Sequence, residues 1–439
     1  MAVRTLLRSS PGAFVLAVAL PIVLVHIDYQ PGFRISVGST RVHVVLSDLA
    51  VLACLLAAAA VASRRGLAGL RAGVPAWVAL ALLLALVVAA SFYPRIGDDP
   101  YPWRDHLVTA TKYVEYALLA PAAGLLVRRR EDVALLGATV VAASVVASAL
   151  AGAQFFGWGI VGGWPAGYRQ PAFLGHHDLA ALSGVALAIG LAAIALPGRF
   201  DRRLAVAAGI AGAIGLFLSG SLAGAIGLVA AAAVAAFVAR GSLGRVGAIV
   251  GIALAVFGGV VLFRSGDVKS FLHLIGIGKK DERVRVETYV QRTMLAYLGW
   301  RVFLDHPVAG AGWQASSDEY VYRPFLPLLH RKFPNTPEQG FPSPQHPYGI
   351  QNAYVQALAD LGVIGLVLLL AALITPLWLA FRRLVRGPPE AATMVAAMAL
   401  LVSMGVLTAL GLVAGIPTDA LLWLAVGLCA TPLLVPDAA

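Results

Sequence analysis

The sequence from Gln351 to Arg383 decides the architecture: QNAYVQALADLGVIGLVLLLAALITPLWLAFRR. It starts with polar residues, continues as an apolar run from about residue 355 to 381, and ends on Arg382 and Arg383. In an α-helix, about 20 predominantly apolar residues are enough to cross the hydrocarbon core of a bilayer. The stretch is therefore predicted to enter a membrane from a polar segment and to leave it at a pair of arginines.

The composition extends this interpretation to the whole chain. Of its 439 residues, 59% are hydrophobic and only 13% are charged, and the mean hydropathy is +0.83. Soluble domains carry about 25% charged residues. The formal net charge of +11 indicates cytoplasmic loops and contact with membrane lipid, because that is where membrane proteins concentrate Lys and Arg. No nucleic-acid partner is expected.

Apolar runs of about 17–25 residues recur and predict an all-α polytopic membrane protein with about twelve transmembrane helices. The runs lie near residues 11–27, 44–62, 74–93, 106–127, 132–155, 177–196, 203–219, 221–239, 246–264, 355–381, 391–413 and 418–435. A long insert separates the ninth run from the tenth. The chain is thus divided into a nine-helix region (1–264), an insert (265–354) and a three-helix region (355–439).

Arginines are distributed unequally over the loops. One set of alternate loops holds Arg4 and Arg8; Arg64, Arg65 and Arg71; Arg128, Arg129 and Arg130; Arg199, Arg202 and Arg203; Arg240 and Arg245; and Arg382, Arg383 and Arg386. The opposite short loops hold Arg34, Arg41, Arg95, Arg104 and Arg169. Cytoplasmic loops carry the excess of positive charge. Both termini are therefore predicted to be cytoplasmic and the insert extracytoplasmic.

Ionisable residues enter several spans from the outer side. They are His26, Asp28, Asp48, Lys112, Glu115, His176, His177 and Asp178. Lys112 and Glu115 are three residues apart, so they share one helix face and are predicted to pair inside the bundle. Such residues usually face the bundle interior or a water-filled cavity, which predicts a polar cavity that opens outward. The alternative is that each one reaches the interface and water.

The outer segments carry further cations. Arg169 follows Trp158, Trp164 and Tyr168, and it is either an interfacial anchor or a phosphate ligand, since its guanidinium forms bidentate contacts. Within the insert, residues 279–305 predict an amphipathic helix that lies along the membrane surface. Residues 320–356 are rich in proline and aromatic residues, and their prolines predict an irregular segment.

Three segments resemble the superfamily of bacterial O-antigen ligases and O-antigen polymerases. They read YRQPAFLGHHDLAALSGVAL, RVFLDHPVAGAGWQASSDEY and QNAYVQALADLGVIGLVLLL. The positions that carry the resemblance are Arg169, Trp300, Asp305, Pro307, Gly310, Gly312, Asn352, Asp360, Gly362 and Gly365. The resemblance covers roughly residues 165–375 and implies a GT-C-like arrangement. Two positions differ from the family pattern, because Leu222 replaces a usual arginine and Gln351 replaces a usual histidine.

The resemblance implies transfer of a glycan from a polyprenyl-diphosphate carrier to a hydroxyl of a glycan or glycolipid acceptor, outside the bacterial cytoplasmic membrane. It implies no cofactor and no metal. The candidates for catalysis are His346, His330 and Glu115. The candidates for binding the diphosphate or the glycan are Arg169, Arg285, Arg292, Arg323, Arg331, Lys112, Asp178, Gln351 and Asn352.

Two alternatives stay open. A secondary transporter would also use many spans and buried charges, although a nine-plus-three layout breaks the two-fold repetition of such proteins. A family member that binds lipid-linked glycan without reacting it would fit Leu222 and Gln351. A transfer assay with Arg169→Ala and His346→Ala distinguishes this non-reacting family member from the enzyme. The sequence does not distinguish a ligase from a polymerase.

Overall fold

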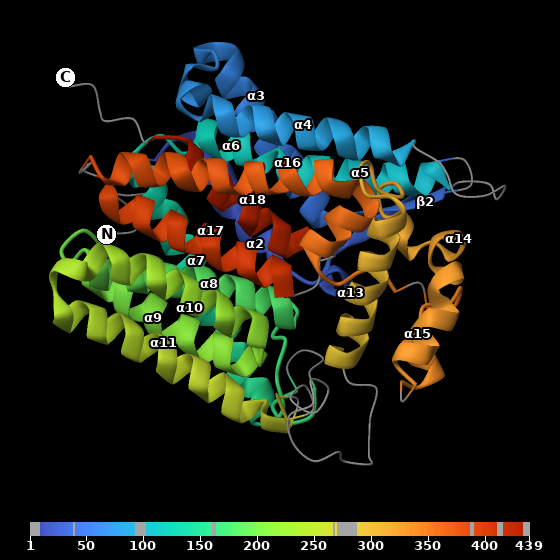
Figure 1. Ribbon diagram of the computed structural model, residues 1–439. Helices are drawn as coiled ribbons and strands as arrows, with labels where there is room; N and C mark the ends of the chain where they lie inside the picture. The colour runs from blue at the N-terminus through green and yellow to red at the C-terminus, as the bar shows by residue number, and fades with distance from the viewer. Residues whose placement is uncertain are drawn as a thin grey trace.

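The computed structural model describes residues 9–37, 40–92, 102–159, 164–266, 268–269, 288–334, 336–346, 348–386, 390–410 and 416–432. Most of them form helices that run side by side in one bundle (Figure 1). The chain is an all-α polytopic membrane protein, as predicted.

The helices of the bundle lie on both sides of the insert in the sequence. Before the insert they are α2 (Pro11–Leu24), α3 (Leu46–Arg65), α4 (Val74–Ser91), α5 (Trp103–Ala117), α6 (Leu119–Leu126), α7 (Arg130–Phe155), α8 (His176–Ala195), α9 (Arg202–Ser219), α10 (Leu222–Val238) and α11 (Leu243–Phe263). After it they are α16 (Ala353–Leu384), α17 (Ala391–Leu410) and α18 (Ile416–Ala430). The insert contributes α13 (Thr288–Asp305), α14 (Glu319–Tyr322) and α15 (Leu326–Lys332).

Each of the twelve predicted spans overlaps helical residues in the described part of the chain, but the number twelve is not confirmed. In the described part of the chain, nine helices are long and apolar enough to cross a membrane. The helix α2 has 14 residues and α18 has 15. The predicted fourth span is divided at Leu118 into α5 and α6.

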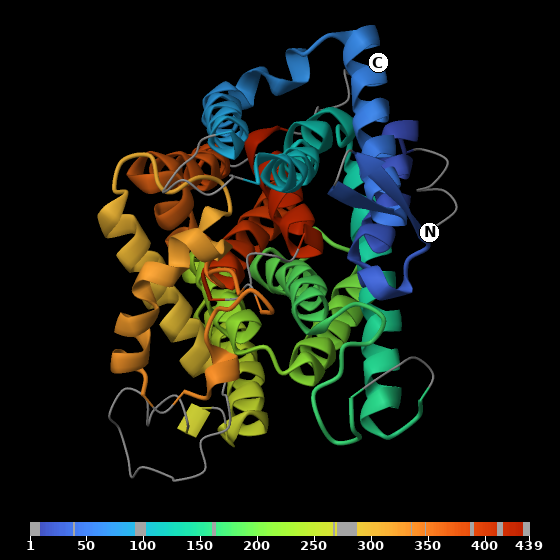
Figure 2. The same cartoon turned by 90° about the vertical axis from the view of Figure 1, so that its right-hand side faces the viewer.

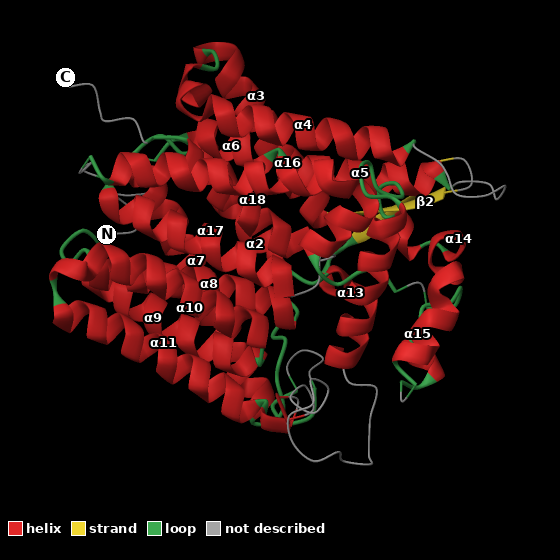
Figure 3. Cartoon of the chain, viewed as in Figure 1, coloured by secondary structure: helices red, strands yellow, loops and turns green. Residues whose placement is uncertain are grey.

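The sequence analysis missed a β-hairpin. Strands β1 (Gly32–Val37) and β2 (Thr40–Val45) pair antiparallel with Gly32 opposite Val45 (Figure 3). Phe33 and Ile35 alternate with Arg34 and Ser36, which is the two-residue period of a strand. The signal was present but short, and it lies next to a much longer apolar run.

One apolar core joins helices from both sides of the insert. It runs from Leu16 on α2 to Cys429 on α18, and the large side chain of Trp423 is fully buried in it. Viewed along the helices in Figure 2, the C-terminal helices (red) lie in the middle, and the insert (gold to orange) lies across part of the end that faces the viewer.

The insert has an apolar core of its own. On α13, Met294, Leu298 and Val302 are fully buried, and they pack with Tyr322 and Phe341 from the rest of the insert. The helix crosses the ends of the bundle helices rather than running along them (Figure 1). The predicted apolar face is therefore real, but in the structure it packs against protein.

The proline-rich part of the insert is more regular than predicted. Residues 319–332 form the short helices α14 and α15, joined by a single 3₁₀ turn at Arg323–Phe325. Pro324 and Pro327 stand at the first positions of their helical turns. Proline is tolerated there because its missing N–H would have no partner in the helix.

Several arginine-rich loops meet at the end of the bundle opposite the insert. Arg245 at the start of α11 donates a hydrogen bond to the Ala195 carbonyl at the end of α8, at 2.7 Å. Arg383 at the end of α16 donates to the Cys429 carbonyl. The bundle therefore has an arginine-rich end and an insert end, in agreement with the unequal distribution of arginine in the sequence.

Candidate functional site

The turn after α13 is joined to a break in α16. The N–H groups of Ala311 and Gly312 donate to the carbonyls of Ala359 and Asp360, each at 2.9 Å. These carbonyls are available because Gly362 leaves the helical conformation, with φ 67° and ψ −166°. The insert is thus fastened to a bundle helix by backbone hydrogen bonds.

Two glycines allow the backbones to approach this closely. Gly362 and Gly310 both have positive φ, 67° and 72°. A Cβ on Gly362 would overlap the Val308 carbonyl, and a Cβ on Gly310 would overlap the backbone of Asp360. Only glycine meets both the conformational and the steric demand. These two positions of the resemblance therefore have a structural role.

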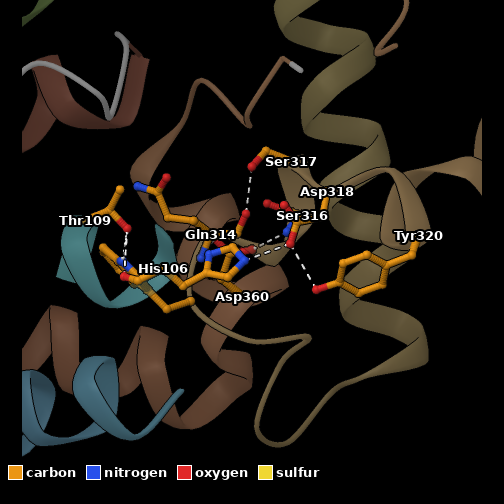
Figure 4. A network of polar contacts seen from close by, with 9 residues as sticks. His106, Thr109, Gln314, Ser316, Ser317, Asp318, Tyr320 and Asp360 are labelled. Atoms are coloured by element: carbon orange, nitrogen blue, oxygen red, sulfur yellow. Dashed lines mark hydrogen bonds and ion pairs between the residues drawn. The ribbon is translucent and has the colours of Figure 1, made fainter. Parts of the chain in front are cut away.

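The carboxylate of Asp360 completes the joint. It is fully buried on α16 and accepts hydrogen bonds from the N–H groups of Gln314 at 3.1 Å and Ser316 at 3.0 Å (Figure 4). Buried charges need such partners to be tolerated. Asp360, Gly310 and Gly362, with the backbone that they hold, are called the glycine joint below.

A second set of contacts fastens the insert to α5. His106 Nε2 lies 2.8 Å from Asp318 Oδ2, and the Tyr320 hydroxyl donates to the same oxygen at 2.9 Å (Figure 4). Trp313 Nε1 donates to the Thr109 hydroxyl at 3.0 Å. The insert is thereby fixed to two helices, and α13 is held over the end of the bundle.

Two arginines meet at the turn between α9 and α10. Gly220 in this turn has φ 58°, and its carbonyl accepts a hydrogen bond from Arg264 Nη1 at 2.9 Å. Arg169 lies on the same side, because a Cβ placed on Gly220 would come within 3.1 Å of Arg169 Cβ and 3.4 Å of Arg264 Cδ. This turn separates the predicted spans 203–219 and 221–239, and its glycine leaves room for both arginine side chains.

A third arginine reaches this region from α13. Arg292 Nε donates to Gln351 Oε1 at 3.0 Å, immediately before α16. Arg292 Nη2 lies 3.4 Å from His177 Nε2, in the first turn of α8. Because an arginine can only donate, the imidazole nitrogen is the acceptor. This contact links the insert to the N-terminus of α8.

Two histidines and a tryptophan complete the group. His176 and His177 both lie close enough to Arg169 and Arg264 to interact with their charges. His176 packs edge-on against Trp164 at 4.6 Å between ring centroids, and the Arg169 guanidinium lies over the same indole at 4.4 Å. Both ring nitrogens of His176, and Nδ1 of His177, are buried without a hydrogen-bond partner among the described residues.

We call Arg169, Arg264, Arg292, His176 and His177 the cationic cluster. Its members come from the loop before α8, from α8 itself, from the residue after α11 and from α13, and Figure 1 shows α13 beside the insert-facing end of α8. Arginines that converge in this way suit an anion, and their planar guanidinium groups match phosphate oxygens in particular.

The close ion pair of Lys112 is with Asp48, whereas Glu115 interacts with the charges of both residues. Lys112 Nζ donates to both carboxylate oxygens of Asp48, at 2.9 and 3.1 Å, and to the His43 carbonyl at 3.2 Å. Asp48 lies on α3, and its Oδ2 also accepts the Val45 N–H. A cross-helix partner that is held in place outcompetes a neighbour on the same helix, and sequence spacing cannot reveal it.

Four predicted residues lie on the insert outside the cationic cluster. Arg323 is exposed and lies 3.9 Å from Glu319, and Arg331 is exposed at the end of α15. His330 stacks on Phe341 at 4.0 Å, and its Nε2 faces Glu338 at 3.2 Å. His346 is exposed in a turn and stacks with Tyr348.

The remaining candidates have mixed positions. Gln351 belongs to the site through Arg292, whereas Asn352 caps α16 by accepting the N–H groups of residues 354 and 355 at 3.1 and 3.0 Å. Asp178 is buried in the first turn of α8, where the helix dipole favours a carboxylate. Arg285 lies outside the described residues.

A pocket of about 480 Å³ lies elsewhere, at the arginine-rich end. Leu70, Val74, Trp77 and Leu118 contribute to its apolar wall, and Arg71 is its charged residue. It lacks the convergent polar groups that orient a reacting ligand. The cationic cluster is therefore the better candidate for chemistry.

Sequence reasoning missed Arg264 and undervalued the two histidines. Arg264 directly follows an apolar run, where arginine commonly marks a helix end. It is 44 residues from Gly220 in the sequence, and only the fold brings the two together. The pair His176–His177 was noted as polar, and its position next to Trp164 and Arg169 in one loop was the available signal.

Part of the chain matches a known protein family. Residues 206–370 match the family model described as O-antigen ligase. No curated protein matches the chain. The matched region contains Arg264, Arg292, Gln351 and the whole glycine joint, and the match supports a relationship between this multi-pass membrane protein and the superfamily of O-antigen ligases and polymerases.

Proposed function

We propose that this protein transfers an oligo- or polysaccharide from a polyprenyl-diphosphate carrier to a hydroxyl group of a glycan or glycolipid acceptor. The reaction takes place at the insert end of the bundle. The observation that carries the proposal is the convergence of Arg169, Arg264 and Arg292 at this end, within a chain that has the O-antigen ligase match.

The chemistry requires stabilisation of a leaving group. The acceptor oxygen forms a bond to C1 of the donor sugar, the bond from C1 to the diphosphate oxygen breaks, and the electron pair stays on the diphosphate. Donors that are fixed where negative charge develops lower the barrier for such a step. Arg169, Arg264 and Arg292 serve this role, and Gln351 orients Arg292.

The surroundings of the cluster suit a lipid-linked glycan. Trp158, Trp164 and Tyr168 are exposed in the loop before α8, and such residues sit at the membrane–water interface. Their rings can also stack on sugars. The insert, which is held by the glycine joint, forms one wall of the site and contributes Arg292 to it.

The orientation follows from the unequal distribution of arginine. The arginine-rich end faces the cytoplasm, both termini lie there, and the site faces the extracytoplasmic side of the bacterial cytoplasmic membrane. A donor lipid then enters from the bilayer, with its diphosphate at the level of the cluster.

The test is a transfer assay with purified protein in nanodiscs. A polyprenyl-diphosphate oligosaccharide is offered with a panel of hydroxyl acceptors, with and without EDTA. The proposal expects polyprenyl diphosphate to be released together with a larger glycan, with no effect of EDTA and with loss of release in Arg169→Ala. Donor binding without release for every acceptor would contradict transfer and indicate a protein that only holds the lipid.

A further inference from the structure

His177 is held in an arrangement that allows it to act on a ligand of the cationic cluster. It lies in the first turn of α8, and its Nε2 is 3.4 Å from Arg292 Nη2. An imidazole nitrogen that accepts from arginine carries a lone pair, so the ring is neutral in this geometry. The contact is long for a hydrogen bond, and it is easily exchanged for a better partner.

Two contacts of Arg292 differ in strength. Its Nε is fixed by Gln351 at 3.0 Å, whereas its Nη2 faces His177. When a diphosphate binds, Nη2 gains a stronger, charge-assisted partner in a phosphate oxygen. The lone pair of His177 Nε2 then becomes available for a proton, next to the atoms that react.

We propose that His177 is the general base that takes the proton of the acceptor hydroxyl, which rests on the transferase function proposed above. The hydroxyl oxygen bonds to C1 of the donor sugar, its proton moves to His177 Nε2, and the diphosphate leaves with its electron pair. The resulting imidazolium releases the proton to water. Binding of the anionic donor draws Arg292 Nη2 toward a phosphate oxygen and leaves His177 Nε2 to accept the proton.

The other candidate bases are engaged elsewhere. His330 has Nδ1 at 2.8 Å from the Leu326 carbonyl and Nε2 next to Glu338. His346 is exposed and stacks with Tyr348. Glu115 lies on α5 in the neighbourhood of Lys112 and Asp48. His177 Nε2, in contrast, faces Arg292 Nη2 at 3.4 Å.

His176 differs from its neighbour. Its ring is fixed edge-on against Trp164, and both nitrogens are buried without a described partner. One of them carries a proton in the neutral ring and can donate to a phosphate oxygen. A ligand-binding role thus suits His176, whereas proton transfer suits His177.

The experiment separates turnover from donor binding. His177→Gln keeps a hydrogen-bonding side chain but cannot take a proton, so kcat should fall by about 10²-fold or more, the range of general-base catalysis, with donor affinity unchanged. In His177→Ala, added imidazole should restore part of the rate. His43→Gln, at an exposed histidine on β2, is the control and should behave as the unmodified protein.

Each outcome decides between the two proposals. If the unmodified protein transfers glycan and His177→Gln does so at the same rate, the assignment of the base is wrong and the transferase function stands. Parallel loss of donor binding and turnover, without imidazole rescue, overturns it in favour of a binding role. An unmodified protein that is inactive with every acceptor would instead contradict the transferase function itself.

Discussion

The glycine joint and the cationic cluster lie at the same end of the molecule, but the polar groups of the two regions are paired differently. In the joint, backbone N–H groups of the turn donate to the main-chain carbonyls of Ala359 and Asp360 at 2.9 Å and to the Asp360 carboxylate at 3.0–3.1 Å. In the cluster, three arginines converge and imidazole nitrogens are buried without a described partner.

The difference explains why residues that carry a resemblance need not be the ones that bind a ligand. Gly310, Asp360 and Gly362 are prominent in the sequence motifs, and the contacts given for them hold the insert in place. Contacts of this kind define a structure, whereas guanidinium groups that converge from several elements suit an anionic ligand.

The largest effect is expected where the joint is tightest. Gly362→Ala would place a Cβ against the Val308 carbonyl at φ 67°, and strain and overpacking each cost on the order of 1–3 kcal/mol. Thermal unfolding in detergent should show a large loss of stability, together with loss of transfer. Gly349→Ala is the matched control, because a Cβ there meets its nearest neighbour at 4.0 Å. Equal stability of the two variants would mean that the joint is not tight.

Removal of an arginine from the cluster should reduce turnover without unfolding the protein. Arg292→Ala takes away a fixed donor at the leaving group, and loss of one such donor typically costs about 10²–10³ in kcat. The steady-state rate of glycan transfer measures this. If Arg292→Ala transferred glycan at the normal rate, the diphosphate would have to bind elsewhere in the protein.

The buried carboxylate should contribute less than the glycines. Asp360→Asn keeps the shape but places an amide NH₂ opposite one of the two backbone donors, so a buried donor loses its partner at a cost of roughly 1–3 kcal/mol. The variant should unfold at a lower temperature and, once folded, bind the donor normally. If the fully folded variant bound the donor more weakly than the unmodified protein, Asp360 would belong to the donor-binding site.

The smallest effect is expected at the exposed surface of the insert. The side chain of Arg323 is 75% exposed and faces Glu319 at 3.9 Å, and surface ion pairs contribute roughly 0–1 kcal/mol. Arg323→Ala should therefore leave both stability and transfer nearly unchanged. A large loss of transfer would show that the substrate extends over α14.

The sequence was sufficient for features set by local composition. Apolar runs predicted the helices, the unequal distribution of arginine predicted the two ends of the bundle, and Arg169 was recognised beside Trp164. Residues such as Gln351 and Arg292 were also identified, although their mutual contact was not. These properties are readable because each depends on neighbours in the chain or on a short motif.

Long-range pairing could not be read in the same way. Lys112 forms its close ion pair with Asp48, 64 residues away in the sequence, rather than with Glu115 on its own helix. The fold places the better acceptor on a neighbouring helix. Arg264 joins Arg169 through the turn at Gly220, and an imidazole reaches Arg292 from α8, whereas the sequence had suggested His346. Such contacts follow from helix packing and leave little trace in a single sequence.

The most direct test of the central claim is the affinity of the purified protein for polyprenyl diphosphate, the leaving group itself. The comparison uses the unmodified protein, Arg169→Gln and Arg292→Gln in the cluster, and Arg331→Gln on the exposed surface of α15. The account predicts at least about tenfold weaker binding for each cluster variant, equivalent to about 1.4 kcal/mol, and unchanged binding for Arg331→Gln. Equal affinity in all four proteins, or a loss confined to Arg331→Gln, would contradict it.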